Sequence, residues 1–142
     1  MNNNTILMPT EGLLVISSYD ATNQYGYYQI FNISNKERIL DRHFYENKLS
    51  ENLISFLGMN AALEYCESVS KICDVYSANQ FAVNWSKNRV CNTKCSDILA
   101  LKSVEKAIEL LNRNDFFSKI KLWLPAWGKA KDFIYNYPQS IS

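Results

Sequence analysis

The chain has 142 residues, of which 47% are hydrophobic and 20% charged, a composition typical of one globular domain that excludes wholesale disorder. Its 15 basic and 14 acidic residues give a formal net charge of +1, which lacks the excess positive charge of a nonspecific nucleic-acid binder. No apolar run approaches the length of a membrane span, and the N-terminus lacks the features of a secretory signal. We therefore expect a cytoplasmic protein without a membrane partner.

The first half of the chain is predicted to form a leader and three strands. Residues 1–10 are polar, and we expect a loose leader there. The short apolar run 13–16, the aromatic and β-branched segment 27–33 and the loosely alternating segment 38–45 each favour a strand. Because short polar turns separate the three segments, they predict an antiparallel meander.

The hydrophobic period then changes to that of a helix, with Ser50 as a candidate N-cap. Ser103 is a second candidate N-cap, in front of another apolar stripe. The remaining predicted elements are a strand over 73–77, a short helix or an extension of the preceding turn over 81–85, a strand over 118–124, and a short helix or ordered tail over 127–137.

The resulting order is β-β-β-α-β-α-α-β-α, without a repeat or linker that would divide the chain. It predicts a single α/β domain over 1–142, with residues 134–142 as its tail. We expect a mixed sheet of five strands with the first three antiparallel and helices packed on both faces.

Four short segments, in the expected order, carry a resemblance to a known family. They are Val15-Ile16-Ser17-Ser18-Tyr19-Asp20-Ala21, Asn52-Leu53-Ile54-Ser55-Phe56-Leu57, Val75-Tyr76-Ser77-Ala78-Asn79-Gln80 continuing to Trp85, and Trp127-Gly128-Lys129-Ala130-Lys131-Asp132-Phe133. These segments resemble the first strand, first helix, fourth strand and closing motif of bacterial ribonuclease HI-type domains. The resemblance covers residues 12–133 and implies the ribonuclease H-like fold.

The resemblance also implies a degenerate catalytic site. Active members of the family hold two magnesium ions with an aspartate, a glutamate and two further aspartates, because Mg²⁺ prefers hard anionic oxygen ligands. Carried over residue by residue, the first and last ligands fall on Asp20 and Asp132, whereas the second and third fall on Ser55 and Ala78. We therefore expect two remnant ligands and no bound metal. The alternative is a weak Mg²⁺ or Mn²⁺ site that recruits Glu51, one helical turn before Ser55.

Nucleic-acid contacts are the second feature that the resemblance implies. Relatives hold a phosphate at the segment occupied here by Ser50-Glu51-Asn52, so Ser50 and Asn52 are candidate contacts. Asn23 is a further candidate, in the turn where active relatives have glycines. A simple helix cap remains the competing interpretation of Ser50, and Glu51 would repel a phosphate.

The cysteines and the single histidine predict no further metal site. Cys66, Cys73, Cys91 and Cys95 are expected to be reduced thiols, since a structural zinc site needs about four ligands. His43 lies on a predicted strand, where a half-exposed residue is the ordinary interpretation.

The function predicted from these observations is a catalytically inactive ribonuclease H-like domain that acts as a binding module. A protein partner is favoured over an RNA–DNA hybrid or structured nucleic acid, and no small-molecule cofactor is expected. The alternative is a weakly active, magnesium-dependent ribonuclease H that cleaves the RNA strand of RNA–DNA hybrids.

Overall fold

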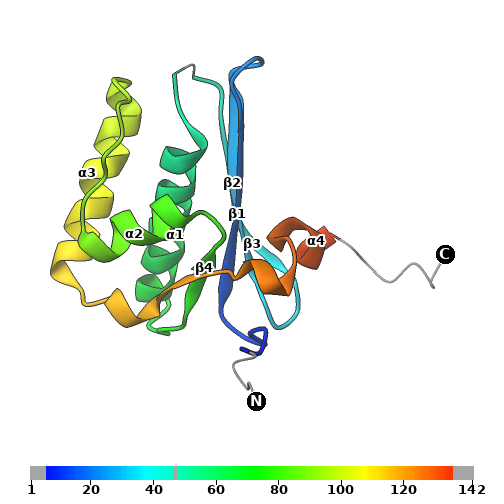
Figure 1. Cartoon of the computed structure of the whole chain (residues 1–142). Helices are drawn as coiled ribbons and strands as arrows, with labels where there is room; N and C mark the ends of the chain where they lie inside the picture. Colours follow the sequence, from blue (N-terminus) through cyan, green and yellow to red (C-terminus); the bar gives the residue numbers. More distant parts are fainter. Residues whose placement is uncertain (1–5, 47, 136–142) are drawn as a thin grey trace.

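One mixed sheet of five strands organises the protein, as a computed structural model that describes residues 6–46 and 48–135 shows (Figure 1). Its strands are β1 (Leu13–Asp20), β2 (Tyr25–Asn32), β3 (Arg38–Phe44), β4 (Val75–Ser77) and β5 (Ile120–Leu122). The order across the sheet is β3-β2-β1-β4-β5. β1 pairs antiparallel with β2, and β2 with β3, whereas β4 runs parallel to both β1 and β5. This topology confirms the predicted mixed sheet of five strands with the first three antiparallel.

Helices cover the sheet on both faces, as predicted. They are α1 (Glu51–Ser68), α2 (Gln80–Asn88), α3 (Ile98–Arg113) and α4 (Ala130–Tyr135), with short 3₁₀ helices η1 (Phe117–Lys119) and η2 (Pro125–Trp127). α1, α2 and α3 lie on one side of the sheet and α4 on the other (Figure 1). Among the residues that the structure describes, no helix is long and apolar enough to cross a membrane.

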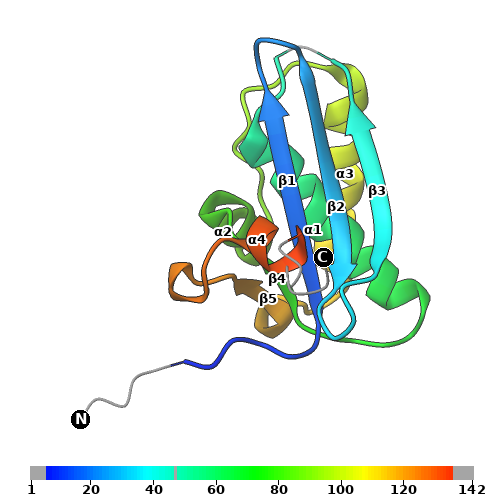
Figure 2. The same ribbon diagram turned by 90° about the vertical axis from the view of Figure 1, so that its right-hand side faces the viewer.

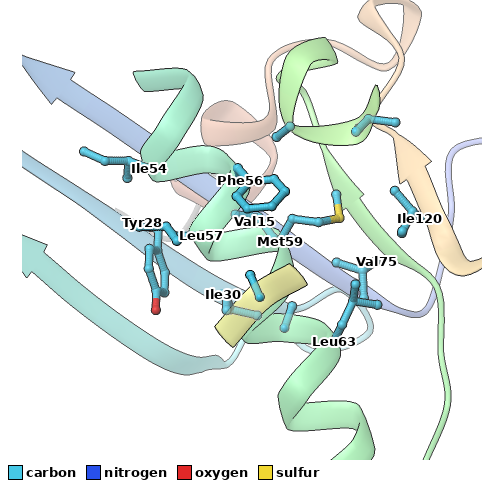
Figure 3. Close-up of a cluster of buried hydrophobic side chains, with 14 of the residues drawn as sticks. Val15, Tyr28, Ile30, Ile54, Phe56, Leu57, Met59, Leu63, Val75 and Ile120 are labelled. Atoms are coloured by element: carbon cyan, nitrogen blue, oxygen red, sulfur yellow. The ribbon is translucent and has the colours of Figure 1, made fainter. Parts of the chain in front are cut away.

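The larger hydrophobic core lies between α1 and the sheet. Val15 and Ile30 from the strands meet Phe56 and Met59 from α1, and all four side chains are buried (Figure 3). α1 approaches the sheet closely at Gly58, where a β-carbon would lie 2.8 Å from Cγ1 of Val15. A glycine is therefore required for this helix to pack so near the strands.

A smaller core lies under α4 on the opposite face. It consists of the buried residues Leu14, Ile16, Phe31, Ile33, Trp123, Ala130 and Ile134. Figure 2 shows that α4 covers the part of this face near β4 and leaves the far half of β1, β2 and β3 open. The indole N–H of Trp123 donates to the carbonyl of Gly128 at 2.9 Å, and that of Trp127 donates to the carbonyl of Ile6 at 3.0 Å. The last part of the predicted leader is thus bonded to η2.

Several element boundaries differ from those predicted. β1 continues four residues beyond the predicted end at Ile16. α3 begins at Ile98 with Asp97 as its N-cap, so the prediction of Ser103 as a cap is wrong. The hydroxyl of Ser103 instead donates to the carbonyl of Leu99 within the helix. Residues 1–5 of the predicted leader and 136–142 of the predicted tail lie outside the described residues, and 134–135 belong to α4.

Candidate functional site

The N-termini of α1 and α2 lie side by side and are fixed by their caps. Ser50 accepts the backbone N–H of Leu53 at 3.1 Å, and the side chain of Asn79 accepts that of Ala82 at 2.9 Å. The side-chain amide of Asn79 also donates to Oδ1 of Asn52 at 2.9 Å, which joins the two helix starts directly. Ser50 therefore acts as the predicted helix cap, and Asn52 is engaged by a second helix.

A groove of about 460 Å³ opens in front of these two helix starts. It is lined by Val15, Ile16, Ser17, Glu51, Asn52, Ser77, Ala78, Asn79, Gln80, Phe81, Lys129, Ala130 and Lys131. Two lysines and one glutamate are its charged residues. Helix N-termini carry partial positive charge, so α1 and α2 add to the effect of the lysines. The groove consequently favours an anionic group over a cation.

The residue of β1 that meets α1 in this groove is Ser17. Its hydroxyl is hydrogen-bonded to that of Ser55, which is fully buried. β1 and β4 pair with Val15 opposite Ser77, so continuing this register places Ile16 beside Ala78. Ser17 and Ala78 thus line the groove, and the buried Ser55 is bonded to Ser17.

Asp20, the first ligand position that the resemblance implies, lies apart from the contact between Ser17 and Ser55. It is the last residue of β1, four residues beyond Ile16, or about 13 Å along the strand. Its carboxylate accepts the backbone N–H of Thr22 at 3.0 Å, and the backbone and side-chain N–H groups of Asn23 at 3.2 and 2.7 Å. These bonds, above all the one from the Asn23 side chain, lower the pKa of Asp20. Asp20 and Asn23 therefore stabilise the β1–β2 turn.

Asp132 is exposed on α4 and is not among the residues that line the groove. α4 packs through Ala130 and Ile134 against Leu14 and Ile16, in the first half of β1. Asp20 ends that strand, and the shared position that the resemblance implies for the two carboxylates stays a prediction. Within the described residues, no group of three or more histidine, cysteine, aspartate or glutamate side chains is placed to hold a metal ion.

The groove also fails the chemical requirements of a two-magnesium site. Serine hydroxyls are neutral, and the Ser17 and Ser55 hydroxyls already bond each other. Ala78 offers no side-chain oxygen. Glu51 is the one carboxylate that lines the groove, and Lys129 and Lys131 line it as well. A pair of divalent ions needs several anionic oxygens to offset its charge, and these residues do not supply them.

Sequence reasoning missed Ser17, Lys129 and Lys131. The alternation of a strand was the available signal for Ser17, because residues two apart face the same side and Val15 is a core residue. The two lysines were within a matched segment, but only Asp132 in that segment was considered. Their side chains line the groove because α4 packs its apolar residues onto β1.

A second feature is an aromatic cluster on the half of the sheet that α4 leaves open. It contains Tyr25, Tyr27, His43 and Tyr45, which we call the tyrosine cluster. The ring of Tyr25 stacks on His43 with centroids 5.7 Å apart, and lies 6.3 Å from Tyr27 and 5.4 Å from Tyr45. The hydroxyl of Tyr25 is bonded to Nδ1 of His43 at 2.6 Å, and Nε2 of His43 lies 2.9 Å from Asp41. His43 is therefore an exposed strand residue, more exposed than the half-exposed position expected, with both ring nitrogens engaged.

Comparison with solved structures finds similar folds at low sequence identity. The chain is similar to ribonuclease H1 from the halophilic archaeon Halobacterium salinarum, at 12% identity over 78% of this chain and 79% of that one, with a TM-score of 0.45. It is also similar to the N-terminal ribonuclease H domain of a Mycobacterium tuberculosis protein, solved as a maltose-binding-protein fusion. That match has 13% identity over 92% and 98% of the two chains and a TM-score of 0.49. No protein-family model and no curated protein matches the chain. At these identities the likeness concerns the fold and not the activity.

Proposed function

We propose that this ribonuclease H-like domain is a catalytically inactive binding module. The observation that carries the proposal is the composition of the groove wall. Ser17 and Ala78 line the groove together with Lys129 and Lys131, and the buried Ser55 is bonded to Ser17. Two-metal phosphodiester cleavage requires carboxylates that position both ions and offset their charge. A wall of two hydroxyls and a methyl group cannot perform this task.

The alternative, a weakly active magnesium-dependent ribonuclease H, rests on Glu51. This carboxylate lines the groove from the first turn of α1. A single glutamate can hold at most one ion weakly, and the neighbouring Lys129 and Lys131 oppose a cation by Coulomb repulsion. The geometry therefore supports the inactive domain better than the weak enzyme.

A protein partner is the ligand that we favour for the module. The net charge of +1 gives little long-range attraction to nucleic acid. Tyrosine is enriched among residues that dominate protein–protein binding, and the tyrosine cluster lies on an uncovered half of the sheet. The rival ligand is nucleic acid, because the lysines and helix N-termini of the groove favour a phosphate group. The four free thiols agree with the cytoplasmic location predicted from the sequence.

Incubation with an RNA–DNA hybrid in Mg²⁺ and in Mn²⁺ tests the inactivity. We expect no cleavage above that of a protein preparation from cells that lack host ribonuclease H. Glu51→Gln is the matched variant, because it removes the charge and preserves the size. Cleavage by the parent that Glu51→Gln abolishes would establish the weak enzyme and overturn the proposal.

Binding of a fluorescent hybrid, followed by anisotropy, tests the preferred ligand. We expect weak binding that falls steeply with salt and is unaffected by Tyr27→Ala. Submicromolar, salt-resistant binding that Lys129→Glu removes would instead identify the groove as a nucleic-acid site and refute the preference for protein.

A further inference from the structure

Two of the four cysteines, Cys66 and Cys73, are in contact where the end of α1 meets the segment that leads into β4. Their Sγ atoms lie 3.2 Å apart, and both are free thiols. Cys66 is only 2% exposed, whereas Cys73 is partly exposed. A soluble reagent can therefore reach Cys73, and Cys66 lies directly behind it.

The backbone between the two residues fixes this contact. The N–H of Lys71 donates to the carbonyl of Cys66 at 3.0 Å, and that of Ser70 donates to Glu67 at 3.1 Å. Ser70 has a φ of 54°, the left-handed conformation that turns the chain back after a helix. Because the turn is closed by its own hydrogen bonds, the sulfur atoms meet without any movement of a long loop.

The segment after Cys73 is held equally well. The carbonyl of Asp74 accepts the N–H of Leu13 at 2.9 Å, which ties the start of β4 to the start of β1. The carboxylate of Asp74 also lies 3.7 Å from Nζ of Lys119. Both thiols thus belong to anchored segments that hold their sulfur atoms in contact.

We propose that Cys66 and Cys73 are a disulfide-forming pair that responds to a low-molecular-weight disulfide such as glutathione disulfide. The Cys73 thiolate attacks one sulfur of the oxidant, forms a mixed disulfide and releases one glutathione thiolate. The Cys66 thiolate then attacks the sulfur of Cys73 and releases the second. The two cysteines lose two protons and two electrons, and the oxidant becomes two molecules of glutathione.

The protein environment sets the speed of this reaction. Burial, together with the hydrogen bond to Cys66, raises the pKa of Cys73 to about 12. The attacking thiolate is therefore scarce at neutral pH, and exchange is slow because the thiolate is the nucleophile. The pair stays reduced under a brief exposure and closes under a sustained one, faster at alkaline pH.

The position of the pair relates it to the groove without placing it there. α1 and β4 form the groove at the N-terminus of the helix and the C-terminal end of the strand. Cys66 and Cys73 join the same two elements at their opposite ends. The disulfide would thus lock the frame of the groove and leave its lining unchanged. The inference does not depend on which ligand the groove or the tyrosine cluster binds.

Incubation of the native protein with excess glutathione disulfide at mildly alkaline pH, followed by alkylation and peptide mapping, tests the proposal. We expect a Cys66–Cys73 cross-linked peptide, a protein two hydrogen atoms lighter, and a melting temperature above that of the reduced form. Cys91→Ser is the matched control and should form the same link. In Cys66→Ser, the mixed disulfide should persist on Cys73, because no thiol remains to displace the glutathione.

Three outcomes would overturn the inference. One is a wild-type protein in which Cys66 and Cys73 both remain alkylatable while Cys91 or Cys95 is oxidised. Another is a glutathione adduct that persists on Cys73 of the wild type, which would mean that Cys66 cannot reach it. The third is a link between Cys73 and either of the other two cysteines.

Discussion

Introducing carboxylates at the groove tests where the metal position that the resemblance implies lies in this chain. The triple variant Ser17→Asp, Ser55→Glu, Ala78→Asp places three acids around the point where β1, α1 and β4 meet. Two carboxylates about 5 Å apart repel by roughly 3 kcal/mol at an effective dielectric constant of about 20. Because Ser55 is fully buried, its replacement also incurs a desolvation cost. Without metal, the triple variant should therefore be several kcal/mol less stable than the parent.

Divalent metal should recover part of this loss. A site with a Kd of about 1 mM gains about 1.4 kcal/mol in 10 mM Mg²⁺ or Mn²⁺, since a ligand that binds only the folded state stabilises it. For a domain of this size that gain raises Tm by about 4 °C. The measurement is thermal unfolding with and without metal. The amide variant Ser17→Asn, Ser55→Gln, Ala78→Asn is the matched control, because it has similar volumes and no charge.

The outcome for Asp20 decides between two registers of β1. The double variant Ser55→Glu, Ala78→Asp should respond to metal much less than the triple variant, because Asp20 lies at the far end of the strand. An equal response of the double variant that Asp20→Asn then removes would refute the placement of Ser17 in the groove wall. The register inferred from the sequence would then be correct.

Three further predictions concern stability. Gly58→Ala should destabilise the fold by about 1 kcal/mol, as measured by urea unfolding. Overpacking against the sheet costs about 1–3 kcal/mol and outweighs the gain in helix propensity of about 1 kcal/mol. A stabilised variant would contradict the close approach of α1. Asn79→Ala should cost more than Ser50→Ala, which removes a cap worth about 1 kcal/mol, because Asn79 also bonds the start of α1. Hydrogen bonds from Asn23 hold the pKa of Asp20 below its ordinary value, so its contribution is present at neutral pH and is lost as the pH falls through that lowered pKa. In Asp20→Asn, the free energy of unfolding should therefore fall less between about pH 5 and 2 than in the parent. An equal fall in both proteins would show that the hydrogen bonds to Asp20 do not form.

The fold was largely predictable because its signals are local. Short apolar runs separated by polar turns predicted the meander, and the apolar spacing after Ser50 predicted α1. The end of β1 was not predictable in this way. Residues 17–20 are polar or half-exposed, and among the described residues no helix covers one face of this far half of the sheet. These residues still pair with β2, because the backbone hydrogen bonds between strands do not require apolar side chains.

The start of α3 was missed for a related reason. Ile98, Leu99 and Leu101 are exposed, so the first turn does not show an apolar stripe on one face. The candidate site required both the resemblance and the register of the strands. The resemblance suggested Ser55 and Ala78 as ligand positions, but the contact of Ser17 with Ser55 depends on strand register, which a sequence segment does not define.

The position of β3 has a consequence for how the protein behaves at high concentration. β3 is the outermost strand beside β2, and it is seven residues long, whereas the strand at the other edge, β5, has three. A long edge strand offers unpaired backbone groups on which another chain can add, and this is a common start of aggregation. Four of its seven residues are Arg38, Asp41, Arg42 and His43, whose polar and charged side chains oppose such addition. The polar residues of β3 thus oppose the addition of another chain at this edge, whereas the short length of β5 opposes it at the other edge.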